Sequence, residues 1–163
     1  MFVVTLKEIN QGHKLNIEDS ARLSFRLMGK ADVQAFWELD QDPEVMRFIT
    51  DGRPSSMETI NDVFMPRLFT YRDAEKGWGI WQVSDKESQE YLGWVLVRPM
   101  DFFSNTPKSN DLELGWRFFK KTWGRGYATE SAVAIKNAFA SRNDIHYVSA
   151  LALEGNIASI SVM

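Results

Sequence analysis

Two glycines that flank a single residue are the part of this sequence best suited to chemistry. They lie in the segment Trp123-Gly124-Arg125-Gly126-Tyr127-Ala128-Thr129-Glu130. Residues 112–118 before it alternate as a strand does, and residues 128–139 after it carry apolar side chains at helical spacing. Glycine lets a backbone pass close to a ligand, and the first turn of a helix offers unpaired N–H groups to an anion. The segment therefore predicts a phosphate cradle.

Three glycine-rich cradles compete for this pattern. The nucleoside-triphosphate loop requires Gly-x-x-x-x-Gly-Lys-Ser/Thr, which the sequence lacks. The dinucleotide fingerprint requires a third glycine where this chain has Thr129, and it belongs in an early strand–helix–strand unit. The third is the coenzyme A pyrophosphate loop of the GNAT N-acetyltransferases, Gln/Arg-x-x-Gly-x-Gly/Ala. Residues 121–126 resemble this loop, with Lys121 in place of the usual Gln or Arg.

Four stretches in the same order extend this resemblance over residues 22–163. The glycine segment, with Glu113-Leu114-Gly115-Trp116 before it, is similar to the GNAT branch of ribosomal-protein N-terminal (alanine) acetyltransferases. The other stretches resemble that branch's opening strand, its first helical segment, and the strand and Asn-x-x-Ser turn after the cradle helix: residues 22–26, 42–48 and 151–159. The resemblance implies the GNAT acyl-CoA N-acyltransferase fold, an α/β (α+β) fold with a mixed, mostly antiparallel sheet flanked by helices.

Composition limits the classes of function. A chain of 163 residues with 44% hydrophobic and 13% aromatic residues is expected to form a single domain, residues 1–163. The net charge of −3 gives no electrostatic case for nucleic acid or an anionic membrane, and no apolar run is long enough to span a bilayer. Residues 1–6 lack a basic leader and a cleavage site, so we expect a cytoplasmic protein.

The chain has no cysteine and two histidines, His13 and His146. This count excludes disulfides, thiolate or histidine-rich metal sites and an acyl-cysteine intermediate, and we expect no metal. Acyl chemistry would then proceed by direct transfer or through a hydroxyl nucleophile, for which the sequence shows no nearby histidine. Direct transfer is the simpler of the two.

The elements expected along the chain are short. Strands are predicted over residues 23–27, 77–83, 91–98, 112–118 and 146–153. Helices are predicted over residues 33–37, from Asp42-Pro43, from the capping box at residues 55–58, and over residues 128–139. In the third of these, Ile60, Val63 and Phe64 should face inward and Pro66 should kink or end the helix. Residues 99–110 are expected to form a loop with an aromatic tip at Phe102 and Phe103, and residues 1–20 an extension with one candidate strand at residues 2–6.

The resemblance also sets an expectation for the C-terminal end. In the family, a short helix begins at the positions of Asn156 and Ser159 and two more strands follow it. Here the sequence stops at Met163, so we expect the final helix and the last strands to be truncated. The strand at residues 146–153 would then have an open edge, and we expect a homodimer or another partner to cover it.

The cofactor implied is acetyl-CoA. Backbone N–H groups of residues 124–128 suit its pyrophosphate, with the Thr129 hydroxyl as a further donor. The Arg125 side chain either stays in solvent or reaches the phosphates. The resemblance implies that the strand before the loop pairs its backbone with the pantetheine arm, while the Trp116 side chain packs in the core. The predicted cofactor residues are Trp116, Arg117, Phe118, Gly124, Arg125, Gly126, Tyr127, Ala128, Thr129 and Asn156.

Glu113 is the candidate general base. By alternation it faces away from Leu112 and Leu114, where a substrate can approach, and a carboxylate beside apolar walls has a raised pKa. The alternatives are a solvated strand glutamate or a structural hydrogen-bond partner. Glu130 is expected to favour the helix start through its charge. The resemblance implies that Asn156 and Ser159 contact the pantetheine and, in some family members, protonate the leaving thiolate.

These features predict an N-acetyltransferase that moves an acetyl group from acetyl-CoA directly to a primary amine. Protein N-termini, polyamines, aminoglycosides and free amino acids all remain open as acceptors. A coenzyme A-binding module with impaired catalysis is the first alternative. A nucleotide-binding domain is the second, although the glycine pattern disagrees with it.

Overall fold

The computed structural model describes residues 14–163, so the strand predicted at residues 2–6 lies outside the described residues. A five-stranded sheet in the order β1-β2-β3-β4-β5 forms the centre of the molecule. Its first four strands pair antiparallel and β5 runs parallel to β4, as the predicted mixed sheet requires. The strands are β1 (Leu23–Leu27), β2 (Gly79–Asp85), β3 (Tyr91–Met100), β4 (Lys108–Phe118) and β5 (Tyr147–Ala150).

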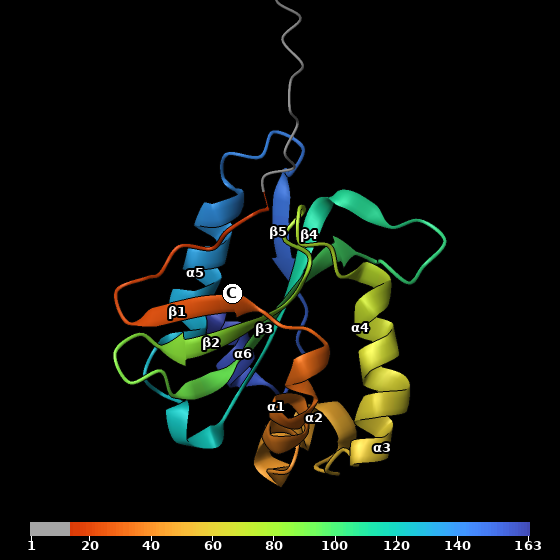
Figure 1. Cartoon of the computed structure of the whole chain (residues 1–163), viewed down its shortest axis with the longest axis vertical. Helices are drawn as coiled ribbons and strands as arrows, with labels where there is room; N and C mark the ends of the chain where they lie inside the picture. Colours follow the sequence, from red (N-terminus) through yellow and green to blue (C-terminus); the bar gives the residue numbers. More distant parts are fainter. Residues whose placement is uncertain (1–13) are drawn as a thin grey trace, which may run out of the picture.

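Helices cover both faces of this sheet, with α5 on one side and α4 on the other (Figure 1). Short helical turns lie at Lys30–Asp32 and Lys120–Thr122, and a π-helix at Ile60–Phe64 joins α3 to α4. The helices are α1 (Val33–Leu39), α2 (Pro43–Thr50), α3 (Met57–Thr59), α4 (Met65–Tyr71), α5 (Tyr127–Phe139) and α6 (Ile157–Val162).

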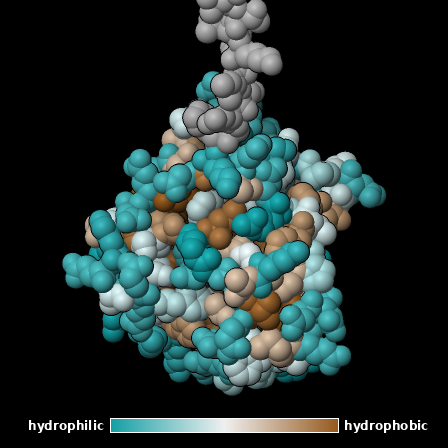
Figure 2. Space-filling model, in the orientation of Figure 1, coloured by the Kyte–Doolittle hydropathy of each residue, from teal (hydrophilic) through white to brown (hydrophobic). Residues whose placement is uncertain are grey.

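Alternation along β4 separates two apolar cores. Leu112, Leu114 and Phe118 are buried against α5, together with Ile135 and Phe139 of that helix. Glu113, Gly115 and Arg117, which alternate with these residues on β4, face the opposite side, where a second core lies between the sheet and α1 to α4. On the face shown in Figure 2, hydrophobic residues form separate areas among polar side chains. The strand predicted from the alternation of residues 112–118 is therefore confirmed.

Short-range capping explains where α2 and α3 begin. Asp42 accepts a hydrogen bond of 2.8 Å from the Glu44 N–H, and Pro43 occupies the first turn, as predicted. The cap of α3 is Ser56, whose hydroxyl accepts a 3.0 Å hydrogen bond from the Thr59 N–H. The expected capping box over residues 55–58 is therefore wrong by one residue. The Ser55 hydroxyl instead donates to Asp40.

Pro66 does not end its helix. The chain continues as α4 to Tyr71, and the N–H of Met65 pairs with the carbonyl of Ile60 in the wider π turn. This wider turn relieves the clash between the proline ring and the preceding turn. It also changes which side chains face the sheet. Ile60 is buried as predicted, but Val63 is 60% exposed, against the prediction.

Two further boundaries differ from the sequence prediction. The strands β3 and β4 extend into the predicted loop at residues 99–110, and Phe102 and Phe103 pack edge-on against Tyr71, with ring centroids 5.7 and 6.1 Å away. They therefore do not form a free aromatic tip. The strand β5 is shorter than the predicted 146–153, because only Asp111 to Leu114 of β4 pair with it. Beyond Leu114 the two parallel strands diverge.

Candidate active site

The glycine loop between β4 and α5 has the geometry of an open cradle. Gly124 and Gly126 have φ of +75° and +78°, in the left-handed region that glycine adopts without strain. A side chain at Gly124 would point into open space, with no atom within 4 Å of its first carbon. Gly126 is the N-cap of α5, and the first N–H groups of a helix have no partner inside it. The loop backbone therefore fits a pyrophosphate.

The divergence of β4 from β5 exposes part of the β4 backbone. The Phe119 N–H donates to the Leu92 carbonyl across the β3–β4 ladder at 3.0 Å. Because hydrogen bonds in an antiparallel ladder alternate sides, the N–H and C=O of Trp116 point away from β3. They face the side from which β5 has diverged. This edge suits the amide-containing arm of a ligand that runs along the strand.

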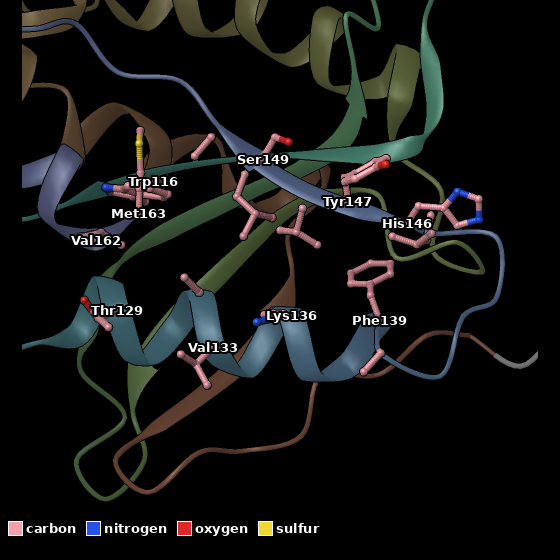
Figure 3. Close-up of a pocket in the computed structure, with 16 residues that line it drawn as sticks. Trp116, Thr129, Val133, Lys136, Phe139, His146, Tyr147, Ser149, Val162 and Met163 are labelled. Atoms are coloured by element: carbon pink, nitrogen blue, oxygen red, sulfur yellow. The ribbon is translucent and has the colours of Figure 1, made fainter.

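A pocket of about 450 Å³ lies between β5 and α5. Figure 3 shows Trp116 and Met163 at one end of it and Phe139 and His146 at the other. Thr129, from the first turn of α5, also lines the pocket. Trp116 and Thr129 of the predicted cofactor set therefore lie at the same pocket.

Glu113 lies on the opposite face of β4, away from α5, and is paired with Arg98. The Arg98 Nε and Nη2 donate to the two Glu113 carboxylate oxygens at 3.0 and 3.4 Å, and both side chains are mostly buried. The Arg98 guanidinium also packs over the rings of Tyr71 and Phe103. The expectation of apolar walls around Glu113 is therefore wrong. Gly115, the next residue on that face, has no side chain, and the first carbon of a side chain there would lie 3.4 Å from the Leu96 Cδ2.

Burial also perturbs a neighbour of this pair. Burial raises the pKa of Tyr71 to about 12, although the charges of Arg98 and Arg67 act in the opposite direction. The phenol therefore stays protonated through the physiological range. The uncharged Tyr71 ring packs against the Arg98 guanidinium, beside the ion pair with Glu113.

The side chains of the other two predicted cofactor residues on β4, Arg117 and Phe118, are used in contacts within the protein. The Arg117 side chain pairs with Asp40 at the end of α1 and lies over the Trp94 ring, 4.8 Å from its centroid. Its backbone N–H and C=O point toward β3, so neither its side chain nor these groups are free for a cofactor. The Phe118 side chain is buried in the α5 core, and its carbonyl accepts a 2.9 Å hydrogen bond from the indole of Trp123. Of the three, Trp116 has the backbone best oriented toward the gap.

Asn156 and Ser159 come together at the start of α6, as predicted. The Asn156 side-chain oxygen accepts a 3.2 Å hydrogen bond from the Ser159 N–H and caps the helix. The segment just before it lies against α2, since a side chain at Gly155 would come within 3.4 Å of the Phe48 ring. The capping role uses the amide oxygen of Asn156 and leaves its nitrogen as a donor.

Three residues of the site were missed at the level of sequence. Arg98 lies directly across from Glu113 in the β3–β4 register, so a correct hairpin register would have found it. Asp40 meets Arg117, and Arg22 meets Glu130, across 77 and 108 residues of chain. No local spacing signals such long-range pairs.

Within residues 14–163, no group of three or more acidic, histidine or cysteine side chains could hold a metal ion.

Comparison with known proteins places this geometry in a family. The profile of the acetyltransferase (GNAT) domain matches residues 22–163. The chain is 34% identical to the FsC-acetyl coenzyme A-N(2)-transacetylase of Aspergillus fumigatus over 69% of this chain and 48% of that protein. It is 30% identical to the protein YkkB of Bacillus subtilis over 86% of this chain and 78% of that one. The chain thus spans about half the length of the fungal relative.

Solved structures share the fold. An acetyltransferase (GNAT family) from Bacillus anthracis superposes with a TM-score of 0.68 at 24% identity, over 90% of this chain and 79% of that one. A ribosomal L7/L12 alpha-N-protein acetyltransferase in complex with coenzyme A gives a TM-score of 0.68 at 17% identity, with the same coverage of 90% and 79%. The fold, the glycine loop and the match over most of the sequence agree, and the chain belongs to the GNAT acetyltransferase family.

Proposed function

We propose that this chain transfers the acetyl group of acetyl-CoA directly to a primary amine. The observation that carries the proposal is the open glycine loop at the start of α5, beside a strand whose backbone at Trp116 faces the gap left by β5. A phosphate group and an extended amide-containing arm are the two parts of coenzyme A that such surfaces bind.

Different residues of the site contact different parts of coenzyme A. The N–H groups of residues 124–128 and the Thr129 hydroxyl bind the pyrophosphate, and the exposed Arg125 side chain reaches the phosphates. The backbone from Trp116 to Phe118 lies along the pantetheine arm. The amide nitrogen of Asn156 contacts the same arm, since its oxygen is used to cap α6.

The chemistry assigned to this chain is one nucleophilic displacement. Glu113 accepts the proton of the attacking amine through a water molecule. The amine nitrogen bonds to the carbonyl carbon and the carbon–sulfur bond breaks. The Ser159 hydroxyl passes a proton to the departing thiolate and regains one from solvent. Arg98 fixes the direction of the Glu113 carboxylate through its two hydrogen bonds. Holding the reacting groups in this order is the main contribution of the protein.

The acceptor is proposed only as a primary amine, of a protein N-terminus or of a small molecule. Proteins that share the fold are described as acting on different amines, among them a ribosomal protein, spermidine and an aminoglycoside. Those structures are between 10% and 17% identical to this chain, so they carry the fold and not the acceptor.

Thermal melting with acetyl-CoA tests the first half of the proposal, with ATP and NAD as controls. A ligand at about 100 times its dissociation constant stabilises a protein by roughly 2.7 kcal/mol, which raises the melting temperature by several degrees. A selective shift with acetyl-CoA supports the cradle. The absence of a shift in a cooperatively folded sample overturns it.

One observation favours a second candidate, a coenzyme A-binding module without catalysis. The proposed base, Glu113, is already held by Arg98 in a two-point ion pair. Melting with acetyl-CoA cannot separate the two candidates, because both bind the cofactor. Release of free coenzyme A with a panel of amines separates them, since only the enzyme produces it in an amine-dependent manner.

We further propose that a second copy of the chain covers the outer edge of β5. In the described residues no strand pairs with that edge, and Tyr147, Leu151 and Ile157 are 64%, 72% and 69% exposed. An unpaired strand edge with apolar neighbours favours association. Light scattering at high concentration should report a dimer, and a clean monomer would contradict this.

Residence in the cytoplasm stays a prediction. No helix in residues 14–163 is long and apolar enough to cross a membrane.

A further inference from the structure

We propose that Arg22, just before β1, is a positioning residue that aims the Gly126 N–H into the phosphate cradle. The inference rests on the proposed coenzyme A function. It assigns a role in that function to a residue far from the glycine loop in sequence.

Arg22 connects three parts of the cradle at once. Its Nε and Nη2 contact the Glu130 Oε2 at 2.7 and 2.6 Å, and its Nη1 donates to the Arg125 carbonyl at 2.9 Å. The guanidinium lies over the Tyr127 ring, 4.5 Å from its centroid. Every group that Arg22 contacts here belongs to the glycine loop or to the first turn of α5.

Glu130 is itself fixed from a second direction. Its Oε1 accepts hydrogen bonds from the Ser20 hydroxyl at 2.7 Å and from the Arg22 N–H at 2.9 Å. The carboxylate therefore ties the segment before β1 to the first turn of α5. The charge expected to favour the helix start also anchors the arginine that contacts the loop.

The geometry of a peptide bond turns this contact into a positioning effect. The Arg125 carbonyl and the Gly126 N–H belong to one planar trans peptide, so they point in opposite directions. When Arg22 binds the carbonyl on one side, the N–H must point to the other side. Gly126 has φ of +78° and glycine also adopts other conformations easily, so the glycines do not fix this peptide by themselves.

The arrangement differs from an ordinary surface ion pair. Exposed pairs contribute little stability, and the Arg22 side chain is 44% exposed. Its planar fork, however, serves a carboxylate and a backbone carbonyl at the same time. A lysine keeps the charge but lacks the fork, so it cannot hold both partners in the same geometry. The effect should therefore appear in ligand binding rather than in stability.

Arg22→Lys tests the proposal through dissociation constants for coenzyme A and, by competition, for its two halves, adenosine 3′-phosphate 5′-diphosphate and pantetheine. Loss of one aligned charge-assisted contact corresponds to roughly a tenfold change. We expect about tenfold weaker binding of coenzyme A and of the nucleotide half, with pantetheine binding unchanged. In turnover, the KM for acetyl-CoA should rise while kcat is retained.

Arg142→Lys is the matched control. Arg142 pairs with Asp144 at 3.1 Å beyond the other end of α5, so the same change there should leave all three ligands unaffected. Glu130→Gln, which keeps the acceptor oxygen but removes the charge, should shift coenzyme A binding in the same direction as Arg22→Lys.

The outcomes separate this proposal from the proposed function. If the wild-type protein does not bind coenzyme A, both are overturned. If the wild type binds it and Arg22→Lys binds equally well, the positioning role alone is overturned. Equal loss of binding of both halves would show a general structural role and would also overturn it.

Discussion

Three structural constraints act on Gly126, a single position of the cradle. Its φ of +78° favours glycine, its carbonyl accepts the first hydrogen bond of α5 from the Glu130 N–H, and a side chain there would approach the Arg22 guanidinium to 3.5 Å. A substitution at Gly126 therefore affects the loop conformation and the phosphate site together.

Gly126→Glu should reduce acetyl-CoA binding by at least about a hundredfold, because it adds strain, bulk and a negative charge at a phosphate site. Calorimetric titration measures the dissociation constant. Gly126→Ala is the matched control, since it introduces the strain alone and should lose less affinity. Unchanged affinity in Gly126→Glu would contradict the cradle.

Glu113→Gln tests the proposed base. General acid–base catalysis contributes about 10² to 10⁴ in rate, so kcat should fall by at least about a hundredfold. The affinity for acetyl-CoA should stay the same, because Glu113 lies on the face of β4 opposite to the α5 side. Glu87→Gln, an exposed glutamate in the β2–β3 turn, is the control. A kcat equal to that of the control would leave Glu113 only a structural role.

At the scale of elements, one buried ion pair joins α1 to β4. Asp40 is 3% exposed, pairs with Arg117 and accepts a 2.6 Å hydrogen bond from the Ser55 hydroxyl. The next residue, Gln41, donates to the Trp37 and Ser55 carbonyls at 2.8 and 2.9 Å, so the end of α1 is also tied to the segment before α3. The end of α1 is therefore held to the strand that carries Glu113.

Asp40→Asn should destabilise the fold by about 3 to 5 kcal/mol, because it leaves the Arg117 charge buried without a partner. Urea unfolding followed by circular dichroism measures the difference. The exposed Lys121–Glu90 pair supplies the comparison, and Glu90→Gln should cost less than about 1 kcal/mol. Similar losses in the two variants would mean that burial of the Asp40 pair has no energetic consequence.

For the whole molecule, two carboxylates link stability to pH. Burial raises the pKa of Glu130, but hydrogen bonds from Ser20 and Arg22 outweigh it, so the pKa lies below the ordinary 4.5. Asp32 behaves in the same way, since burial raises its pKa and its bonds from Arg26 and the Gly29 N–H bring it below 3.8. A carboxylate with a lowered folded-state pKa stabilises the fold above its unfolded pKa. This contribution is lost as the pH falls through the folded value.

The free energy of unfolding should therefore fall as the pH decreases below about 4.5. Urea unfolding at pH 7, 4.5 and 3 measures this dependence. The difference between the wild type and Glu130→Gln should be largest at pH 7 and shrink as the pH falls through the lowered folded-state pKa of Glu130. A constant difference across this range would contradict the Glu130 linkage.

The sequence by itself determined the local features. The strand at residues 112–118, the caps at Asp42 and Asn156 and the left-handed glycines follow from alternation, short side-chain bonds and backbone sterics, which act over a few residues. The family could be identified for the same reason, because its motif is a run of neighbouring residues. Val63 shows the limit of this reasoning, since it lies within the π-helix at Ile60–Phe64 just before Pro66, which changed the direction it faces.

Only the tertiary structure decided which side chains meet. The pairs Arg98–Glu113, Asp40–Arg117 and Arg22–Glu130 join residues 15, 77 and 108 positions apart. Strand register and helix packing create these contacts, and both depend on burying the two apolar cores as a whole rather than on any local signal. The same physical reason explains the length of β5. It ends where β4 diverges from it, and that divergence opens the gap beside Trp116.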